Sequence, residues 1–275
     1  MEAYLAVMEK LINESKFQNR VFKRNVLKDY LQILVLDFIY SSKKYKDLVF
    51  YGGSCLAHCF SLPRLSEDLD FVDIAKLTDL NVLAKDIALF VKKELGIDIK
   101  TSVQKFRIYL KFPLLRDLGL AGKSESDLLF LKIEVFKDFE YCTKCNTEIT
   151  PLFKFNRSIL VRTFDISTLM ATKINAVLRR VWIKKDKTGR EVVRVKGRDY
   201  FDLMWYLEKG IKPNIDCIIG IDDMVALKKK LLENVAKLDK DSIKIDLEPL
   251  IEDATFVDNF SCNIKEILKR QILSL

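Results

Sequence analysis

The sequence contains a single histidine, His58, among 275 residues. A mechanism built on a Ser-His-Asp or Cys-His arrangement would therefore have to use this one residue. On a predicted helix His58 shares a face with Cys55 and Cys59, which could also suggest a metal site. We expect this face to be buried core instead, so histidine-based catalysis and a histidine-cysteine metal site are both disfavoured.

The chain also lacks an apolar run of the roughly 18 residues that a membrane-spanning helix requires. Its first residues have neither a basic stretch nor a small-residue cleavage site, so they do not resemble a secretory signal. We therefore expect a cytoplasmic protein without membrane contact, whose six cysteines are reduced thiols. Cys142 and Cys145 form one C-x-x-C pair with no second pair nearby, which is only half of a zinc ligand set.

Positive charge is concentrated in one segment. The whole chain has a net charge of +8, and residues 179–198 alone carry nine basic and two acidic residues. A solvated basic hairpin and an arm that contacts nucleic-acid phosphates both explain this segment. Its position beside candidate functional residues favours the arm.

Hydrophobic periodicity divides the chain near residue 164 into an α/β half, residues 1–164, and a helical half, residues 165–275. Apolar or alternating runs predict strands at residues 47–51, 69–72, 98–102, 106–114, 128–136 and 158–164. Helical patterns predict two helices within residues 1–46 and others at residues 55–62, 80–95, 166–182, 198–208, 222–237 and 258–273. No low-complexity segment or flexible linker separates the halves.

The most informative motif is Gly52-Gly53-Ser54, which follows a short strand and precedes a helix-compatible segment. Backbone amides at a helix start attract phosphate because they have no partner within the helix. Asp68 and Asp70 follow on a predicted strand, where residues two apart point to the same face and can hold a divalent cation together. A phosphate cradle beside such a pair is what nucleotide transfer from a triphosphate requires.

Further candidates occur later in the chain. Glu134 is a lone carboxylate in an apolar strand, so it is either a surface residue at a strand edge or needs a cation, a metal or several donors. Lys173 either snorkels to water from its helix or faces a triphosphate. Asp199 and Asp202 lie at a helix start, where the helix dipole favours acidic residues and where Lys196 or Arg198 could pair with them.

These motifs, in this order and spacing, resemble the AbiEii/AbiGii family of nucleotidyltransferase toxins of the abortive-infection and type IV toxin–antitoxin kind. The resemblance extends over about residues 45–210 and includes the segment Lys-Gly-Arg-Asp-Tyr-Phe-Asp-Leu at residues 196–203. It implies a phosphate-binding or nucleotide-binding role for Gly52, Gly53, Ser54, Arg64, Ser66 and Lys173. It implies catalytic roles for Asp68, Asp70, Glu134, Lys173, Asp199 and Asp202, of which Asp68, Asp70 and Glu134 would bind metal. Relatives often have a second strand carboxylate where this chain has Phe136.

The resemblance implies an α+β fold, with a polymerase-beta-like mixed sheet, flanking helices and a C-terminal helical domain. It also implies Mg²⁺ or Mn²⁺ as cofactor, an NTP substrate, an RNA acceptor such as the 3′ end of tRNA, a block of translation and a possible cognate antitoxin. Three other functions stay open at this point. They are a decayed nucleic-acid or partner-binding protein, a phosphotransferase or nucleotidyltransferase that modifies protein, and an enzyme acting on a small molecule.

Overall fold

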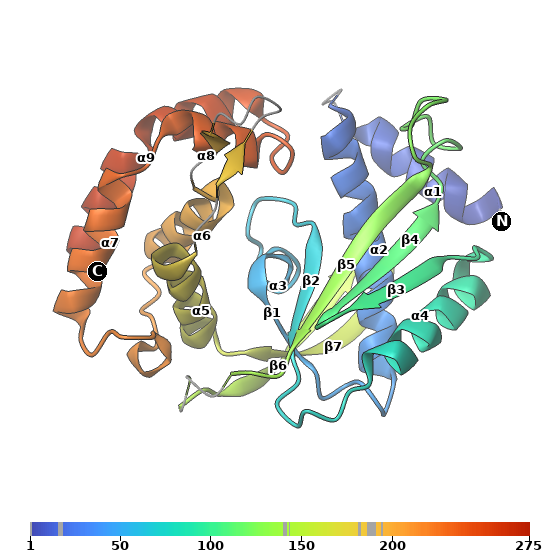
Figure 1. The fold of residues 1–275 in the computed structure, drawn as a ribbon, viewed down its shortest axis with the longest axis horizontal. Coiled ribbons are helices and arrows are strands. Elements are labelled where there is room, and N and C mark those ends of the chain that lie inside the picture. The colour runs from blue at the N-terminus through green and yellow to red at the C-terminus, as the bar shows by residue number, and fades with distance from the viewer. Residues whose placement is uncertain are drawn as a thin grey trace. The chain divides into compact units, whose positions relative to one another are not determined.

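The computed structural model describes residues 2–15, 19–139, 142, 144–180, 183–185, 191–193 and 195–275. The chain divides into two compact units. Unit 1 comprises Met1–Phe139 and Thr147–Thr163, and unit 2 comprises Glu140–Asn146 and Phe164–Leu275. Unit 1 contains the large sheet with its helices, whereas unit 2 is mainly helical (Figure 1).

Unit 1 is built around a mixed sheet. Its helices are α1 (Glu2–Glu14), α2 (Arg20–Ser41), α3 (Gly52–Cys59) and α4 (Leu80–Leu95). Its strands are β1 (Val49–Tyr51), β2 (Asp68–Val72), β3 (Lys100–Gln104), β4 (Arg107–Pro113), β5 (Leu128–Phe136), β6 (Thr147–Lys154) and β7 (Arg157–Phe164). The described residues form a seven-stranded sheet in the order β3-β4-β5-β2-β1-β7-β6.

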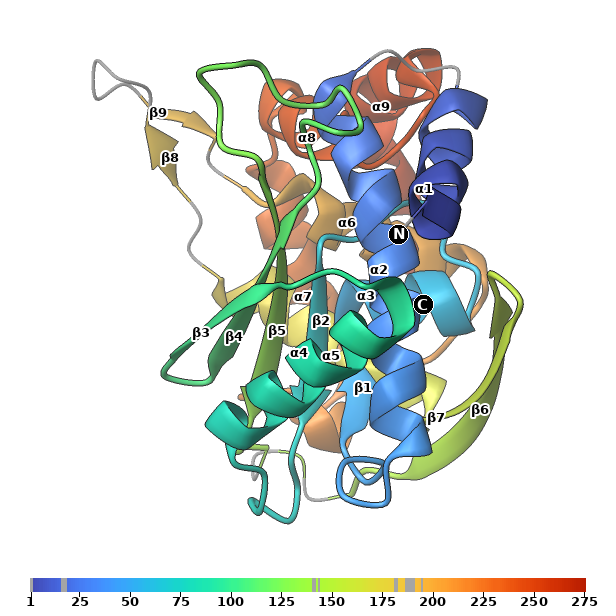
Figure 2. The same ribbon diagram turned by 90° about the vertical axis from the view of Figure 1, so that its right-hand side faces the viewer.

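The centre of this sheet is the parallel pair β2 and β5, with β4 antiparallel on the far side of β5. Alternate residues of β5 are apolar and fully or nearly fully buried, as in Leu131, Ile133 and Val135. Helices α2 and α4 lie on the same side of the sheet (Figure 2), and their buried stripes complete this core. The alternate residues of β2 and β5, which include Asp68, Asp70, Lys132 and Glu134, lie on the opposite face.

Unit 2 contains α5 (Ile166–Arg179), α6 (Gly197–Glu208), the 3₁₀ turn η1 (Ile215–Cys217), α7 (Met224–Ala236), α8 (Lys240–Leu247), α9 (Ala254–Ser274) and the short strands β8 (Lys184–Lys185) and β9 (Glu191–Val193). Four of its helices begin with an aspartate whose side chain accepts a hydrogen bond from a first-turn amide, which is favourable at a helix start. Among the described residues, no helix is both long enough and apolar enough to cross a membrane.

Most predicted elements are confirmed, and the helix Leu80–Leu95 and the strand Leu128–Phe136 have the predicted ends. The three-residue or shorter elements β8, β9 and η1 were not predicted, and two longer elements were missed. Strand β6 contains Pro151, which is tolerated because β6 is the last strand of the sheet order. Helix α8 has the sequence Lys-Asp-Ser-Ile-Lys-Ile-Asp-Leu, which is short and has few apolar residues. Helix α3 begins at Gly52, three residues earlier than predicted, so the glycine motif forms its first turn.

We expect Leu131→Ala to lower the free energy of unfolding by about 2–5 kcal/mol, because Leu131 is fully buried in the central strand. The matched control is Phe130→Ala on the same strand, since Phe130 is 44% exposed on the other face. We expect the control to lose less than about 1 kcal/mol. Urea unfolding followed by circular dichroism measures both, and equal losses would contradict this description of the core.

Candidate functional site

The glycine motif lies directly against other predicted site residues of unit 1. Gly52 has a φ of +80°, and a Cβ placed on it would collide with the carboxylate of Asp70. A Cβ on Gly53 would lie 2.6 Å from Nη2 of Arg64 and 3.2 Å from Oγ of Ser66. Only glycine therefore leaves room for the start of α3 to approach Asp70 and Arg64 this closely. The structure thus brings the predicted phosphate motif and the first carboxylate pair together.

The start of α3 has polar groups that its own helix does not satisfy. The residue before the helix, Tyr51, makes no side-chain hydrogen bond to the first-turn amides. Ser54 is fully buried, and its Oγ has no hydrogen-bond partner among the described residues. Buried hydroxyl groups without a partner are uncommon because they cost free energy. A bound phosphate group would give this turn an acceptor for its donors.

Three predicted metal ligands lie on one face of the central sheet. In the parallel pair of β2 and β5, Asp68 lies opposite Lys132 and Asp70 opposite Glu134. The side chains of Asp68 and Glu134 are 28% and 12% exposed, so both are accessible but sheltered. Because β5 lies between β4 and β2, Glu134 is not a residue of a strand edge. The surface explanation for this carboxylate is therefore wrong.

Two cations that sequence reasoning did not select neutralise these carboxylates. The Nζ of Lys132 lies 3.0 Å from Asp68 Oδ2 and 2.9 Å from Glu134 Oε1. The Nε of Arg107, on β4, donates to the same Glu134 oxygen at 2.6 Å. Burial alone would raise the pKa of Glu134, but the hydrogen bonds and charges of these two cations lower it below its ordinary value. The pKa of Lys132 is raised by both carboxylates despite its burial. The sequence did contain a signal for Lys132, because it lies two residues before Glu134 on β5 and therefore shares its face.

The chemistry of this face fits a hard divalent cation, because carboxylate oxygens on one sheet face are ligands that Mg²⁺ accepts. In this conformation, however, no three acidic, cysteine or histidine side chains of the described residues are gathered closely enough to hold a metal. Lys132 lies between Asp68 and Glu134 instead. A metal would therefore have to replace this lysine between the two carboxylates.

Lys173, Asp199 and Asp202 form a buried ion cluster inside unit 2. The Nζ of Lys173 lies 2.9 Å from Asp199 Oδ1 and 2.7 Å from Asp202 Oδ2. Nη1 of Arg180 lies 2.5 Å from the second oxygen of Asp199. Burial alone would raise the pKa of Asp199, but the neighbouring cations lower it to about 2. Lys173 does not snorkel to water, since its side chain is only 10% exposed. The helices α5 and α6 thus hold these three residues together.

The two cations suggested as partners for these aspartates lie in the same region. Arg198 reaches Asp246 of α8, with Nε 3.7 Å from Oδ2 and its backbone amide donating to that oxygen at 3.0 Å. Burial and the charges of Arg198 and Arg180 lower the pKa of Lys196 to about 8. Arg180, which sequence reasoning did not select, is the arginine that pairs directly with Asp199.

His58 lies in a buried network of unit 1. Its Nε2 lies 2.8 Å from Gln32 Oε1, and its Nδ1 lies 3.4 Å from Lys154 Nζ and 3.7 Å from Asp29. Burial lowers the pKa of His58 to about 4, so the imidazole is neutral at neutral pH. Cys55, on the same helix, is also fully buried. The prediction that this helix face is core is confirmed for these two residues.

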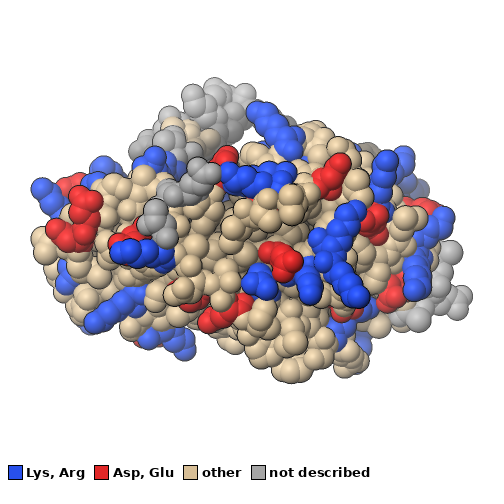
Figure 3. Space-filling view, turned by 90° about the horizontal axis from the view of Figure 1, so that it is seen from below, with Lys and Arg blue, Asp and Glu red and all other residues tan. Residues whose placement is uncertain are grey.

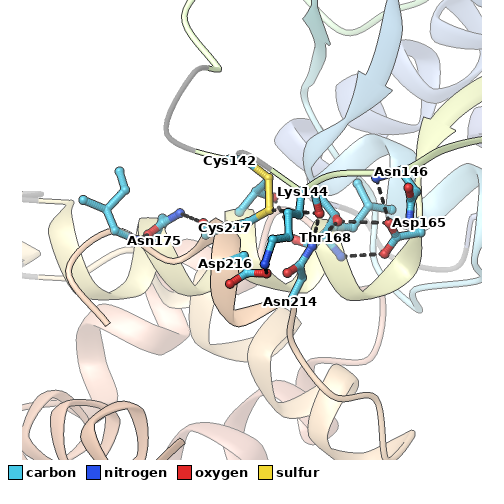
Figure 4. The surroundings of a disulfide bond; sticks show 12 residues. Cys142, Lys144, Asn146, Asp165, Thr168, Asn175, Asn214, Asp216 and Cys217 are labelled. Carbon is cyan, nitrogen blue, oxygen red and sulfur yellow. Dashed lines mark hydrogen bonds and ion pairs between the residues drawn. A yellow bond between two sulfur atoms is a disulfide. The ribbon is translucent and has the colours of Figure 1, made fainter. Parts of the chain in front are cut away.

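The expectation that all six cysteines are reduced thiols is wrong for two of them. Cys142 and Cys217 form a disulfide in unit 2 (Figure 4). Around it, Asn214 donates to the Lys144 carbonyl at 2.7 Å, and Lys144 pairs with Asp216 at 3.1 Å. Cys217 is 75 residues from Cys142, so sequence spacing gave no indication of this contact. Burial raises the pKa of Cys145, which is free.

Part of the basic segment 179–198 lies outside the described residues, and its predicted contact with nucleic acid stays a prediction. The side chains of Lys184 and Lys185 and all of Lys187, Arg190 and Arg194 are among those not described. On the face of the molecule in Figure 3, basic side chains alternate with acidic and neutral ones and form no single continuous patch.

The family model for the nucleotidyl transferase AbiEii toxin of type IV toxin–antitoxin systems matches residues 35–258. This match covers most of the chain, which therefore belongs to the AbiEii family of nucleotidyltransferase toxins. The predicted resemblance is confirmed, and the chain is a nucleotidyl transfer enzyme by family. Membership implies an NTP substrate and a cognate antitoxin.

The fold is similar to that of a solved nucleotidyltransferase toxin. MenT4, a nucleotidyltransferase toxin from Mycobacterium tuberculosis, matches with a TM-score of 0.59 and 13% identity over 98% of this chain and 90% of its own. The Helicobacter pylori protein JHP933 matches with a TM-score of 0.48 and 18% identity over 91% of this chain and 94% of its own. No curated protein sequence matches significantly. The predicted fold class, a mixed nucleotidyltransferase sheet with flanking helices, is confirmed.

We expect Gly52→Ala to be more destabilising than Gly119→Ala. Both glycines have a positive φ, +80° and +66°, so each alanine incurs about 1–2 kcal/mol of backbone strain. A Cβ at Gly119 meets nothing within 4 Å, whereas at Gly52 it also displaces Asp70. Thermal unfolding measures the difference. Equal melting temperatures for the two variants would show that α3 does not press against Asp70.

We expect Asp199→Asn to remove a pH-dependent part of the stability. The pKa of Asp199 is lowered from 3.8 to about 2, so its contribution is complete above pH 3.8 and is lost as the pH falls through 2. The shift corresponds to about 2 kcal/mol at neutral pH. Urea unfolding at pH 7 and pH 2.5 should show the wild type and the variant converging at the lower pH. A constant difference would contradict the assignment.

Proposed function

We propose that this chain is a metal-dependent nucleotidyltransferase that transfers a nucleoside monophosphate from an NTP to RNA, with the 3′ end of tRNA as the acceptor. Modification of that end would block translation, because tRNA must carry an amino acid there. The observation that carries the proposal is the row formed by Asp68, Asp70 and Glu134 on one sheet face, beside the start of α3. Family membership supports the same reaction class.

Different residues of unit 1 would bind the triphosphate and the metal ion. The first amides of α3, at Gly53 and Ser54, hold the triphosphate, because an α-helix start presents unpaired donors and a positive dipole. Asp68, Asp70 and Glu134 would hold Mg²⁺ or Mn²⁺, which would stabilise the negative charge that develops during phosphoryl transfer. Glu134 would also accept the proton of the attacking hydroxyl group.

Arg64 and Ser66 belong to the same phosphate motif in this proposal. Nη2 of Arg64 lies against Gly53. Its guanidinium carries a permanent charge that suits phosphate oxygens. The carbonyl of Ser66 accepts a hydrogen bond from Gln32 Nε2 at 2.9 Å, which fixes the loop that carries both residues.

Lys173, Asp199 and Asp202 keep the roles that the family pattern implies, namely a cation for the triphosphate and its acidic partners. Lys173 is neutralised by both aspartates in unit 2, so a triphosphate would compete with them for its charge. Asp199 would then hold the Lys173 ammonium group in position until the substrate binds.

The choice of an RNA acceptor rests on family membership and on charge. A chain with a net charge of +8 attracts polyanions at low salt. A protein hydroxyl group or a small molecule would not gain as much from this charge. RNA is therefore the acceptor that we propose, with a cognate antitoxin as a further partner.

The test is a label-transfer assay. Purified protein is incubated with Mg²⁺, total cellular RNA and each α-³²P-labelled NTP in turn. We expect label from at least one NTP to enter RNA of tRNA size. Asp68→Asn and Asp70→Asn should each reduce this transfer at least about 100-fold, since both remove a metal ligand.

Asp98→Asn is the matched control, because Asp98 is an exposed aspartate of unit 1 whose side chain is 77% exposed. It should transfer label as the wild type does. Label in protein instead of RNA would support nucleotidyl transfer but reject RNA as the acceptor. Absence of transfer to RNA, protein and small molecules would favour a decayed binding protein and reject the proposal.

A further inference from the structure

Lys132 occupies the position between two of the proposed metal ligands. Its Nζ lies 3.0 Å from Asp68 Oδ2 and 2.9 Å from Glu134 Oε1, and it comes from the same strand as Glu134. In the sheet register Lys132 lies opposite Asp68 on the neighbouring strand. The strand itself therefore delivers a cation to the carboxylates, since residues 132 and 134 share one face.

Lys132 lowers the net negative charge of the sheet face that carries the proposed metal ligands. Asp68, Asp70 and Glu134 carry three negative charges. Lys132 and Arg107 carry two positive charges that partly compensate them. These five side chains together present a net charge of only −1 to a divalent ion that approaches alone, and Glu134 Oε1 is already bound to both cations. Since ion affinity depends strongly on the charge of the ligand set, such a site binds a free divalent ion weakly.

A nucleotide changes this balance. The triphosphate of an NTP brings about four negative charges, which compensate the charge of a displaced lysine and add oxygen ligands for the metal. The side chain of Lys132 is 26% exposed, so it can leave the carboxylates without opening the core. Its long flexible stem and compact ammonium group suit a residue that changes partners.

We infer that Lys132 is a positioning residue that acts as a resident cation, so that the carboxylate row accepts a divalent ion together with the nucleotide rather than before it. This inference rests on the proposed function, since it assumes that Asp68 and Glu134 are metal ligands. It adds an order of binding and assigns a role to a residue outside the family pattern. It concerns affinity for the ion, which can be measured without any catalytic turnover.

The experiment measures the affinity of the full chain for Mn²⁺. The protein is titrated with Mn²⁺, and electron paramagnetic resonance monitors the concentration of the free ion. It compares wild type with Lys132→Met, first without nucleotide and then with a non-hydrolysable NTP analogue. We expect Lys132→Met to bind Mn²⁺ at least tenfold more tightly than wild type without nucleotide. Adding the analogue should tighten Mn²⁺ binding strongly in wild type and much less in the variant.

Lys111→Met is the matched control. Lys111 lies on the adjacent strand β4, and its register partner Phe130 shares the face of Lys132. Its Nζ lies 5.8 Å from the centre of the Phe130 ring, so its removal leaves the Lys132 ion pairs in place. We expect its Mn²⁺ affinity to equal that of wild type. Lys132→Gln, which keeps a polar side chain, replaces Lys132→Met if the latter unfolds, as judged by circular dichroism.

Equal Mn²⁺ affinities for wild type and Lys132→Met would overturn this inference. The proposed function would survive that result if wild type still transfers label. A control variant that tightens Mn²⁺ binding as much as Lys132→Met would also overturn it, because the effect would then be one of general surface charge. Failure of every variant to bind Mn²⁺ with the analogue present would reject both the inference and the metal-dependent function.

Discussion

The parallel pairing of β2 with β5 is the constraint on which the unit 1 site depends. It joins strands that are about 60 residues apart in sequence and sets Asp68 opposite Lys132 and Asp70 opposite Glu134. A slip of one residue would turn β5 over and place its charged residues in the core. The apolar side chains that α2 and α4 cover therefore fix the positions of the charged ones. The alternation of apolar and charged residues along β2 and β5 thus specifies both the core packing and the site geometry.

The start of α3 adds a second constraint to the same place. Gly52 follows β1 directly, and β1 pairs with β2 so that Tyr51 lies opposite Asp70. The chain then turns into a helix at a residue whose Cβ would collide with that aspartate. The phosphate motif and the carboxylate row are thus held by one continuous set of backbone hydrogen bonds. Their close approach follows from strand pairing and the absence of a side chain, and no flexible loop is required.

The sequence predicted most of the elements because their apolar patterns are strong, as in Leu80–Leu95 and Leu128–Phe136. It also selected the motif residues of unit 1 that the structure brings together. What it could not supply were contacts between distant residues. The partnership of Lys132 with Asp68 depends on which strands pair, and the disulfide of Cys142 depends on where Cys217 lies. To predict which side chains pair with a buried charge, one must know which strands pair and in what register. A single sequence does not give that register.

In both charged clusters, carboxylates pair with cations of the same unit. In unit 2, the buried Asp199 and Asp202 pair with the buried Lys173, and Asp199 also pairs with the exposed Arg180. Burying an unpaired charge is far more costly than burying a paired one, so the pairs allow reactive groups to be kept away from water without unfolding the chain. Under the proposed function, a polyanionic substrate would have to compete with carboxylates of the chain for these cations. Binding of such a substrate to either cluster would then be an exchange of ion partners, and its strength would depend on how well the substrate replaces the carboxylate that leaves.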